Sequence, residues 1–489
     1  MADHLSSVFT SLRVLLRGSS STEGQLASVP EESTTGFTDV LGPPPNSYRN
    51  SIRSVGIVFP EWPIRSSLSS QSGQSGSNYD YSDSGESRSN NSGYSSNSAS
   101  VSPDLGTTEL MKIAQRMVSD GYTQRMVRAF HSTSPTETVG PDLVLKNWFV
   151  ELDVDWVLQL RLQLQLQKVT AYWLQELVQR WIRALTIIVA SIKEVMLVHE
   201  ALAVARFGKA SISAMLVIVD TMLDVIQEDK LQVVLHMYMC VSSASYMIMM
   251  MPVVFLEAQR ILDEISASLK AEENRLVQAI SSTMMDIRTD YYEISWDIEI
   301  ERSGGGIHTK IRFLVDCILS MRKTCALTLN SAQSQCTVKL RDAIDETIDY
   351  LKDQLLSDSR MSSDPSLRSM FLLNNSNFVA QLLEIKLTTE CEKYKDFYLH
   401  FSWAHLLSYI QKSNFLELSS AFHKTYQTQK FWKVPDPQLR DALRGAIIER
   451  VISRYRDYLK EHPELAEQVS RGSNSPEVLE EMLGELFEG

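Results

Sequence analysis

Cysteine is scarce in this chain of 489 residues, which has five cysteines and no CxxC pair. An odd number of widely spaced cysteines argues against a disulfide framework. Without closely spaced Cys or His ligands, a zinc site is not expected either. The sequence therefore predicts free, buried thiols in a reducing cytosol and no metal ion. The five are Cys240, Cys317, Cys325, Cys336 and Cys391.

Basic residues are also in deficit. The chain has 47 Lys and Arg against 60 Asp and Glu, which gives a formal net charge of −13 and a pI of about 5.3. A nucleic-acid partner would require a basic face, so the composition argues against this class of partner. The same deficit weakens any simple electrostatic attraction to anionic lipid.

Catalytic motifs are missing as well. There is no HExxH and no GxSxG, and Gly304–Gly306 is not followed by GK[ST], so it indicates a flexible hinge rather than a P-loop. Gly208-Lys209 lacks the Walker spacing. The nine histidines are scattered, and His400 and His405, five residues apart, do not share a helix face. We therefore predict no catalytic residues, no cofactor and no enzymatic activity.

The first hundred residues contain little that could form a core. Seventeen serines lie between Ser66 and Ser102, mixed with Gly, Asn and Gln, which predicts a disordered tail over residues 1–104. No secretory signal peptide is evident, because residues 1–17 contain Asp3 and only a broken apolar stretch. We therefore expect a cytoplasmic protein.

Three short segments interrupt this tail. Residues 8–16 could form an amphipathic helix, and Val55–Trp62 is an apolar stretch that could act as a docking peptide. For both, incidental hydrophobicity is the alternative. Phe37–Val40 fits the loose aromatic-x-x-aliphatic pattern of peptides that bind autophagy receptors, a pattern short enough to arise by chance.

From Thr107 onward, apolar residues recur every three or four positions, which predicts helices throughout. Gly121 is placed to end the first of them. Asp436 and Ser475 each precede a proline and are predicted to be N-caps. The alternation LQLRLQLQL at residues 158–166 is a local strand signal that tertiary context should override. The predicted fold class is all-α.

Two local features are expected to organise the C-terminal half. An apolar stripe from Leu439 to Leu459 predicts one long helix. Pro463 should end it, because proline disfavours helix in the residue before it. Asn374 and Asn375 lie within an apolar stretch and are interpreted as structural hydrogen-bonding residues at a packed helix crossing.

The segment Leu231–Leu256 contains no Asp, Glu, Lys or Arg. A bilayer span needs about 20 mainly apolar residues, so its length would suffice. Gln232, His236 and Pro252 interrupt it, which favours two buried helices instead. A methionine-rich surface that receives a partner is a third possibility, with dense core packing as the default.

Five segments carry a resemblance to a known family: FWKVPDPQLRDALRGAIIERVISRYRDYL (residues 431–459), SPEVLEEMLGELFEG (475–489), IAQRMVSDGY, GGGIHTKIRFLVDCI and MFLLNNSNFVAQLL. They resemble segments of the plant seventy-kilodalton exocyst subunit family, the first two its C-terminal signature. With the helical pattern, this predicts an elongated rod of stacked antiparallel helical bundles. Its N-terminal bundles would cover residues 105–302 and its C-terminal bundles residues 303–489.

The resemblance implies a non-catalytic subunit that tethers secretory vesicles to the plasma membrane, with other exocyst subunits as partners. In the family, basic residues near the C-terminal tip bind phosphoinositide head groups, through Lys or Arg paired with phosphate. Here we expect that role from Arg450, Arg454, Arg456, Lys460 and Arg471. Pairing of these bases with acids three or four residues away is the alternative.

Two departures from the family leave other hypotheses open. Typical members begin with a long N-terminal coiled coil that joins them to the complex, and no sustained heptads occur here. From Glu461 onward there are eight acids and one base, where the family has a lysine-rich turn. One alternative is an interaction adaptor outside the complex, with plant-immunity or autophagy proteins as partners. Another is a membrane-anchored variant through residues 231–256.

Overall fold

The computed structural model of the chain describes residues 47–57, 105–132, 141–160, 171–196, 200–226, 230–290, 300, 303–328, 335–360, 362–411, 415–469 and 474–488. Every regular element in these ranges is a helix, and one isolated antiparallel bridge joins Lys433 and Glu488. The predicted all-α class is confirmed. Of the alternating segment, residues 158–160 lie in helix α7 (Trp156–Leu160), and the rest lies outside the described residues.

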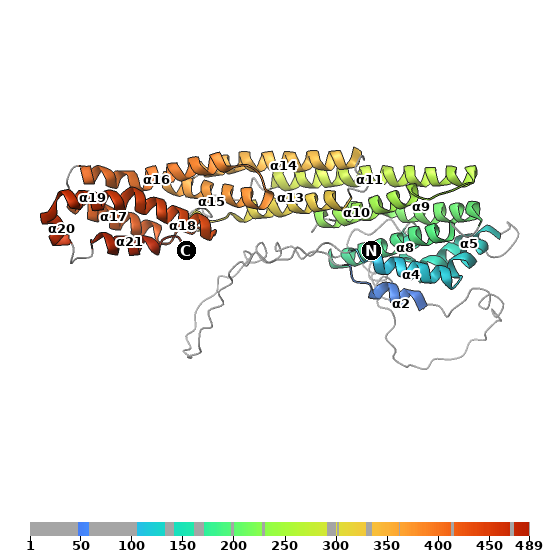
Figure 1. Ribbon diagram of the computed structural model, residues 1–489. Coiled ribbons are helices and arrows are strands. Elements are labelled where there is room, and N and C mark those ends of the chain that lie inside the picture. Colours follow the sequence, from blue (N-terminus) through green and yellow to red (C-terminus); the bar gives the residue numbers. More distant parts are fainter. Residues whose placement is uncertain are drawn as a thin grey trace, which may run out of the picture. The chain divides into compact units, whose positions relative to one another are not determined.

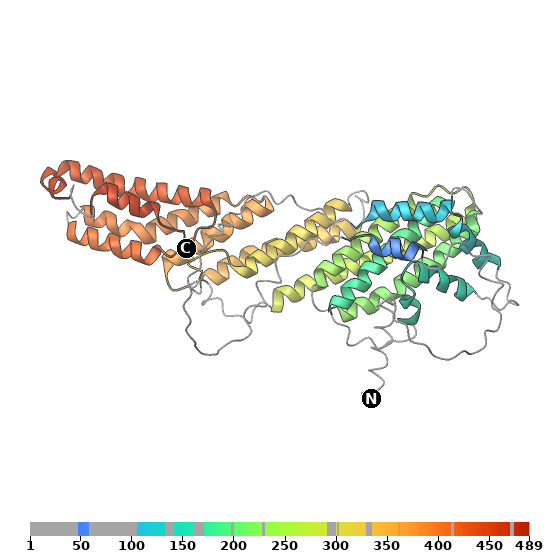
Figure 2. The ribbon, with the colours of Figure 1, turned by 90° about the horizontal axis from the view of Figure 1, so that it is seen from below.

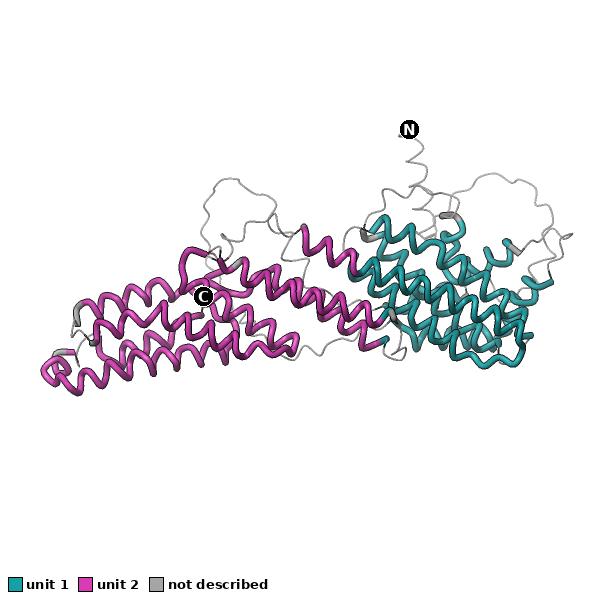
Figure 3. Tube along the Cα trace, turned by 90° about the horizontal axis from the view of Figure 1, so that it is seen from above, with its two compact units in different colours: residues 1–61, 87–280, 328–336 teal, residues 62–86, 281–327, 337–489 magenta. Residues whose placement is uncertain are grey.

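The described residues form two compact units (Figure 3). Unit 1 contains those up to Ile280 together with Thr328 and residues 335–336, and unit 2 contains the others from Ser281 onward. The division falls within helix α11 (Leu256–Asp290), whereas the sequence suggested a division between residues 302 and 303.

Unit 1 is a bundle of helices around α8 (Ala171–Met196). This helix packs against α4 (Thr107–Ser119), α9 (Ala201–Val225) and α10 (Lys230–Met249) (Figure 1). Because α8 meets helices on several sides, its central turns are apolar and buried, with Trp181 at 0% exposure. The unit is completed by α2 (Ser47–Ser54), α5 (Tyr122–Ser132), α6 (Pro141–Glu151), α7 and the first part of α11.

The uncharged segment Leu231–Leu256 forms most of α10 and the turn after it. Within the described residues, α9 and α10 are the two helices long and apolar enough to cross a membrane. However, 67% and 78% of their most apolar windows are buried inside the fold. Core helices pass the same test of length and composition, so this burial favours the predicted buried helices over a membrane span.

The default prediction of dense core packing is wrong for the turn between α10 and α11, which is exposed. Val254 is 96% exposed and Leu256 is 87% exposed. Pro252, three residues after the end of α10, has no amide hydrogen with which to resume the helix, and the apolar residues beyond it leave the bundle. The exposed apolar residues here are Met249, Met250, Val254, Phe255 and Leu256.

A buried carboxyl on α11 makes unit 1 sensitive to pH. Burial, reinforced by the charge of Asp220, raises the pKa of Glu272 to about 7, although Arg275 lies 3.4 Å from its Oε2. The unfolded carboxyl titrates near 4.3, so the folded chain binds more protons between these values. The stability that this group contributes is therefore lost as pH rises from about 4 through 7.

Glu272→Gln is accordingly expected to stabilise the chain at pH 8, by about 2 kcal/mol, and hardly at pH 4.5. Thermal unfolding of both proteins at the two pH values measures this difference. Glu264→Gln is the control, because Glu264 is an exposed carboxylate held by Lys209 at 2.6 Å and its loss should stabilise at neither pH. Equal effects of Glu272→Gln at pH 4.5 and 8 would contradict the assignment.

Unit 2 is a second bundle, built on α16 (Thr388–Gln411), which packs along α15 (Pro365–Leu383) and against α17 (Phe415–Gln429) and α19 (Ser453–Glu461) (Figure 2). Its buried aromatic residues include Trp403 and link α16 to α17. The unit also contains α13 (Thr309–Leu327), nearly all of α14 (Gln335–Ser359), α18 (Pro437–Ile447), the π-helical turn η4 (Ile448–Ile452), α20 (Pro463–Val469) and α21 (Pro476–Gly484).

Both predicted N-caps are confirmed. Asp436 Oδ1 accepts a hydrogen bond from the Leu439 amide at 2.6 Å, and Ser475 Oγ accepts one from the Val478 amide at 3.3 Å. The long helix ends at Glu461, before the proline, as expected. It runs as α18, η4 and α19 without a break, and the wider π turn in its middle was not predicted.

The glycine-rich turn at residues 304–306 is a braced junction rather than the predicted flexible hinge. Asn374 Nδ2 donates to the carbonyl oxygen of Gly305 at 2.7 Å. Asn375 Nδ2 donates to that of Gly306 at 3.0 Å, and its Oδ1 accepts the His308 amide at 3.0 Å. Both asparagines are buried, which confirms their interpretation as hydrogen-bonding residues at a packed crossing.

Residues 47–57 depart from the predicted disordered tail. They form α2 and a short extended stretch that packs on unit 1, where Arg183 Nε donates to the carbonyl oxygen of Val55 at 2.9 Å. Val55 and Ile57 are buried, which fits the docking interpretation for residues 55–57, and residues 58–62 of the predicted segment lie outside the described residues. The predicted motifs at residues 8–16 and 37–40 lie outside the described residues.

Candidate functional site

The two arginines of α18 in unit 2 pair with Glu488, near the end of the chain. Glu488 forms ion pairs with Arg440 and with Arg444, the latter at 2.7 Å. Arg444 Nε also donates to the carbonyl oxygen of Leu486 at 3.1 Å. The hydrogen bond from Arg444 and the charges of both arginines hold the pKa of Glu488 below its usual value. These two guanidiniums are therefore satisfied within the chain.

The residues predicted to bind lipid have unequal surroundings. Arg456 forms an ion pair with Glu480, and Lys460 pairs with Asp457 at 2.9 Å. Arg471 lies outside the described residues. Lys460 therefore pairs with an acid three residues away, which is the alternative that the sequence offered. The pairing of Arg456 with an acid of α21 was not predicted.

Arg450 and Arg454 remain without an ion pair among the described residues. Arg450 is half-buried and Arg454 is exposed, and they are four residues apart, so both lie on one side of the helix that runs through η4 into α19. Of the predicted lipid-binding residues that are described, these two keep their charge available to an anion.

The segment that carries Glu488 is held by a backbone and a side-chain hydrogen bond. The Val434 amide donates to the carbonyl oxygen of Phe487 at 3.1 Å, and Tyr426 Oη donates to Glu485 at 2.9 Å. Phe487 adopts a left-handed conformation with φ of 71° and is fully buried, its ring 6.1 Å from that of Tyr398. Residues 485–488 are therefore held in a defined conformation on the surface of unit 2.

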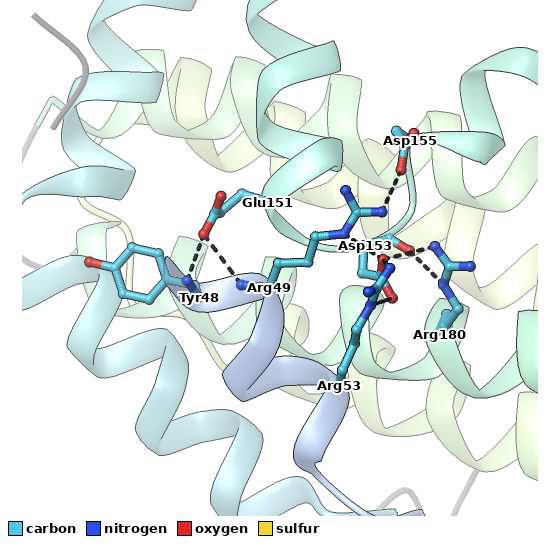
Figure 4. Close-up of polar contacts among 7 residues, drawn as sticks. All are labelled: Tyr48, Arg49, Arg53, Glu151, Asp153, Asp155 and Arg180. Carbon is cyan, nitrogen blue, oxygen red and sulfur yellow. Dashed lines mark hydrogen bonds and ion pairs between the residues drawn. The ribbon is translucent and has the colours of Figure 1, made fainter. Parts of the chain in front are cut away.

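A second cluster of charges lies in unit 1, centred on Asp153 (Figure 4). Its carboxylate forms ion pairs with Arg49 at 2.7 Å, Arg53 at 2.6 Å and Arg180 at 2.8 Å. Asp153 follows α6 in a left-handed conformation with φ of 64°, which Asp tolerates better than most residues. Arg180 comes from α8, and the other two arginines come from α2.

This cluster was not predicted from the sequence. The available signal was a pair of arginines four residues apart, at positions 49 and 53, within the predicted tail. Burial alone would raise the pKa of Asp153, but the hydrogen bond from Arg53 and the three guanidinium charges outweigh it and lower the pKa. Burial lowers the pKa of Arg180. The cluster is therefore a charged site held by mutual pairing.

Metal-ligating side chains do not cluster in the part of the chain that the structure describes. No group of three or more His, Cys, Asp or Glu that could hold a metal ion occurs in these ranges. All five cysteines are free, and four are buried, with Cys391 half-buried. Fold and sites together define a class: a helical-bundle protein whose notable chemistry lies in charged contact surfaces.

Comparison with known proteins gives this class a family. The family model for the C-terminal part of the Exo70 subunit of the exocyst complex matches residues 180–485. This match covers more than half of the chain, so the chain belongs to the Exo70 exocyst subunit family.

The curated relatives are distant and are matched only in part. The chain is 28% identical to exocyst complex component EXO70C1 of Arabidopsis thaliana over 164 residues, which is 27% of this chain and 25% of that protein. It is 23% identical to EXO70A3 of the same plant over 270 residues, 45% of each. The chain thus spans between a quarter and just under half of the length of these relatives.

Among solved structures, the chain is similar to the S. cerevisiae exocyst component Exo70p. It has 12% sequence identity and a TM-score of 0.38, and the alignment covers 79% of this chain and 80% of that one.

Proposed function

We propose that this protein is a non-catalytic exocyst-type subunit that acts in tethering secretory vesicles to the plasma membrane. The observation that carries the proposal is the family match over residues 180–485. The two helical bundles support it, because they present separate surfaces on which several partners can bind at once. The expected partners are other exocyst subunits, and the expected location is the cytoplasm, at the periphery of the plasma membrane.

Affinity purification of the tagged full-length protein from plant cells, followed by mass spectrometry, tests this proposal. Recovery of the other exocyst subunits in stoichiometric amounts would support a role in tethering. Failure to recover any exocyst subunit would overturn it. Extraction with high salt or alkaline carbonate should release the protein from membranes, whereas resistance to both would favour an anchor through residues 231–256.

The second candidate function is an interaction adaptor outside the exocyst complex, in plant immunity or autophagy-linked traffic. The observation that favours it is the pairing of Arg440, Arg444 and Arg456 with acids of the last residues, which leaves fewer cations for a membrane. Recovery of receptors or signalling proteins without exocyst subunits would support this candidate. Full rescue of a secretion defect by the chain would count against it.

A phosphoinositide-containing membrane remains a proposed partner, and the lack of an ion pair at Arg450 and Arg454 among the described residues supports these two as the proposed contacts. Arg450→Gln with Arg454→Gln should weaken binding to phosphoinositide vesicles by roughly 30-fold, since each basic residue near an anionic surface contributes about 1 kcal/mol. Vesicle co-sedimentation at fixed ionic strength measures the loss.

The matched control is Arg456→Gln with Lys460→Gln, which removes the same charge from residues that are already paired. It should change vesicle binding by less than about 3-fold, because paired surface cations contribute little. If both double variants lose binding equally, the distinction between paired and available cations is wrong. If the unchanged protein does not bind these vesicles, direct lipid binding is excluded.

A further inference from the structure

Helix α2 occupies a surface of unit 1 formed by α4 and α6 (Figures 1 and 2). It contributes only eight residues, and its partners lie about a hundred positions further along the chain. An isolated helix of this length is not stable in water, so its structure depends on the surface that receives it. The contacts are therefore those of a short helical ligand with its binding site.

The apolar part of this contact is continuous. Tyr48 is 2% exposed and Ile52 is 1% exposed, and being four residues apart they lie on one face of α2. The Tyr48 ring lies 5.5 Å from that of Tyr122, and its hydroxyl donates to Asp120 at 2.7 Å. After the helix, Val55 packs so closely on Gly106 that a Cβ there would lie 2.4 Å from its Cγ1.

The polar part of the contact is specific for a helix. Glu151 Oε1 accepts the backbone amides of Tyr48 at 2.6 Å and of Arg49 at 3.3 Å. These amides belong to the first turn of α2, whose donors have no partner within the helix. The carboxylate therefore recognises a helix start, and its negative charge is favourable at that end of a helix.

The arginines of α2 provide the second part of the recognition. Arg49 and Arg53 both reach Asp153, and Arg49 also approaches Asp155 at 3.5 Å (Figure 4). Asp153 thus pairs with two guanidiniums from α2 and with Arg180, while Asp155 approaches only that of Arg49 among the described residues. Without α2, Asp153 would keep Arg180 as its ion-pair partner and Asp155 would lose its contact with Arg49, so the vacated surface would become more negative by two charges.

We propose that this surface of unit 1, which we call the Asp153 site, is a receptor for a short helix with two arginines one turn apart. Residues 47–57 are its tethered ligand, bound reversibly within the same chain. Occupancy of the Asp153 site determines whether the N-terminal segment is held on unit 1 or released. Because Arg180 remains paired with Asp153 in either state, the site keeps its structure when α2 leaves.

Cleavage of the tether tests this proposal on the full-length protein. A protease recognition sequence is inserted between Ser75 and Gly76, the chain is immobilised by a C-terminal tag, and dissociation of the 1–75 fragment is followed after cleavage. The wild-type fragment should remain bound. Arg49→Gln with Arg53→Gln should weaken its binding by about 100-fold, the scale of losing hydrogen-bonded partners of a buried charge.

The control makes an equal change of charge on the exposed side of α2, away from the buried face of Tyr48 and Ile52. Asn50 and Ser54 are exposed and four residues apart, so Asn50→Glu with Ser54→Glu makes the fragment more negative by the same amount without touching the Asp153 site. Its binding should stay within about 3-fold of wild type. Equal binding of all three fragments, equal weakening in both double variants, or immediate release of the wild-type fragment would each overturn the proposal.

Two further measurements distinguish loss of recognition from misfolding and from dimer formation. Synthetic peptides of residues 45–59 are added to the cleaved wild-type protein, so that a folding defect of the variant chain cannot decide the result. The wild-type peptide should displace the fragment, and the peptide that carries Arg49→Gln and Arg53→Gln should not. Displacement by both peptides would overturn the role of the arginines. Light scattering of the uncleaved chain should show a monomer, whereas a dimer would place the helix of a second copy in the site and overturn tethering in cis.

Discussion

Asp153→Asn is expected to lower the free energy of unfolding of unit 1 by about 3 kcal/mol, because it removes the shared partner of three guanidiniums. Arg180 is 4% exposed and would be left buried without a counter-charge. Asparagine has nearly the same shape and tolerates the left-handed backbone at this position, so the loss reports the charge. Urea unfolding, monitored through hydrogen exchange of peptides from α8, measures this change in unfolding free energy.

The control for this prediction is Asp155→Asn. Asp155 lies 3.5 Å from Arg49, and its loss should cost less than about 1 kcal/mol. The effect of Asp153→Asn should also depend on pH. Because the folded pKa of Asp153 is lowered, its stabilisation is present above the unfolded value of about 4 and is lost as pH falls through the folded value. A wild-type advantage that stays constant down to pH 2 would contradict the ion-pair account.

Asn375→Ala is expected to destabilise unit 2 by about 3 kcal/mol, since it leaves a buried amide and a buried carbonyl without their side-chain partner. Asn375 is 0% exposed, accepts from the His308 amide and donates to the carbonyl oxygens of Gly306 and Phe371. Its removal should loosen the junction at residues 304–308. Hydrogen exchange should therefore increase there first, ahead of global unfolding of the unit.

Asn377→Ala provides the comparison on the same helix. Asn377 is half-buried and makes no side-chain hydrogen bond among the described residues, so this change should cost less than about 0.5 kcal/mol. If the two substitutions have equal effects, the cost belongs to truncation of an asparagine on α15. The asparagine brace of the glycine turn would then have no role in stability.

Local sequence signals were sufficient for much of unit 2. The caps at Asp436 and Ser475 and the helix end before Pro463 depend on residues one to three positions away, so they could be identified without a fold. The interpretation of Asn374 and Asn375 also held. Their partners in the glycine turn lie 67 to 69 residues earlier in the chain and could not be identified from periodicity.

Pairing between distant charges was the main feature that the sequence did not reveal. The excess of acids after Glu461 was visible in the sequence, but nothing local showed that Glu488 pairs with Arg440 and Arg444. The serine-rich surroundings of residues 47–57 indicated disorder, because composition averages over a window much longer than α2. The apolar face of α2 can be identified only from the surface of unit 1 on which it packs.

The sequence by itself determined that this chain is helical, where many of its helices begin and end, and to which family it belongs. The helical class and the helix ends follow from the spacing of apolar residues and from the residues at helix ends, which act over one or two turns, whereas family membership rests on the family match over residues 180–485. The tertiary structure alone decided which charges are neutralised and that α2 belongs to unit 1. An ion pair or a docked helix requires two segments to meet, and their separation along the chain carries no information about that meeting.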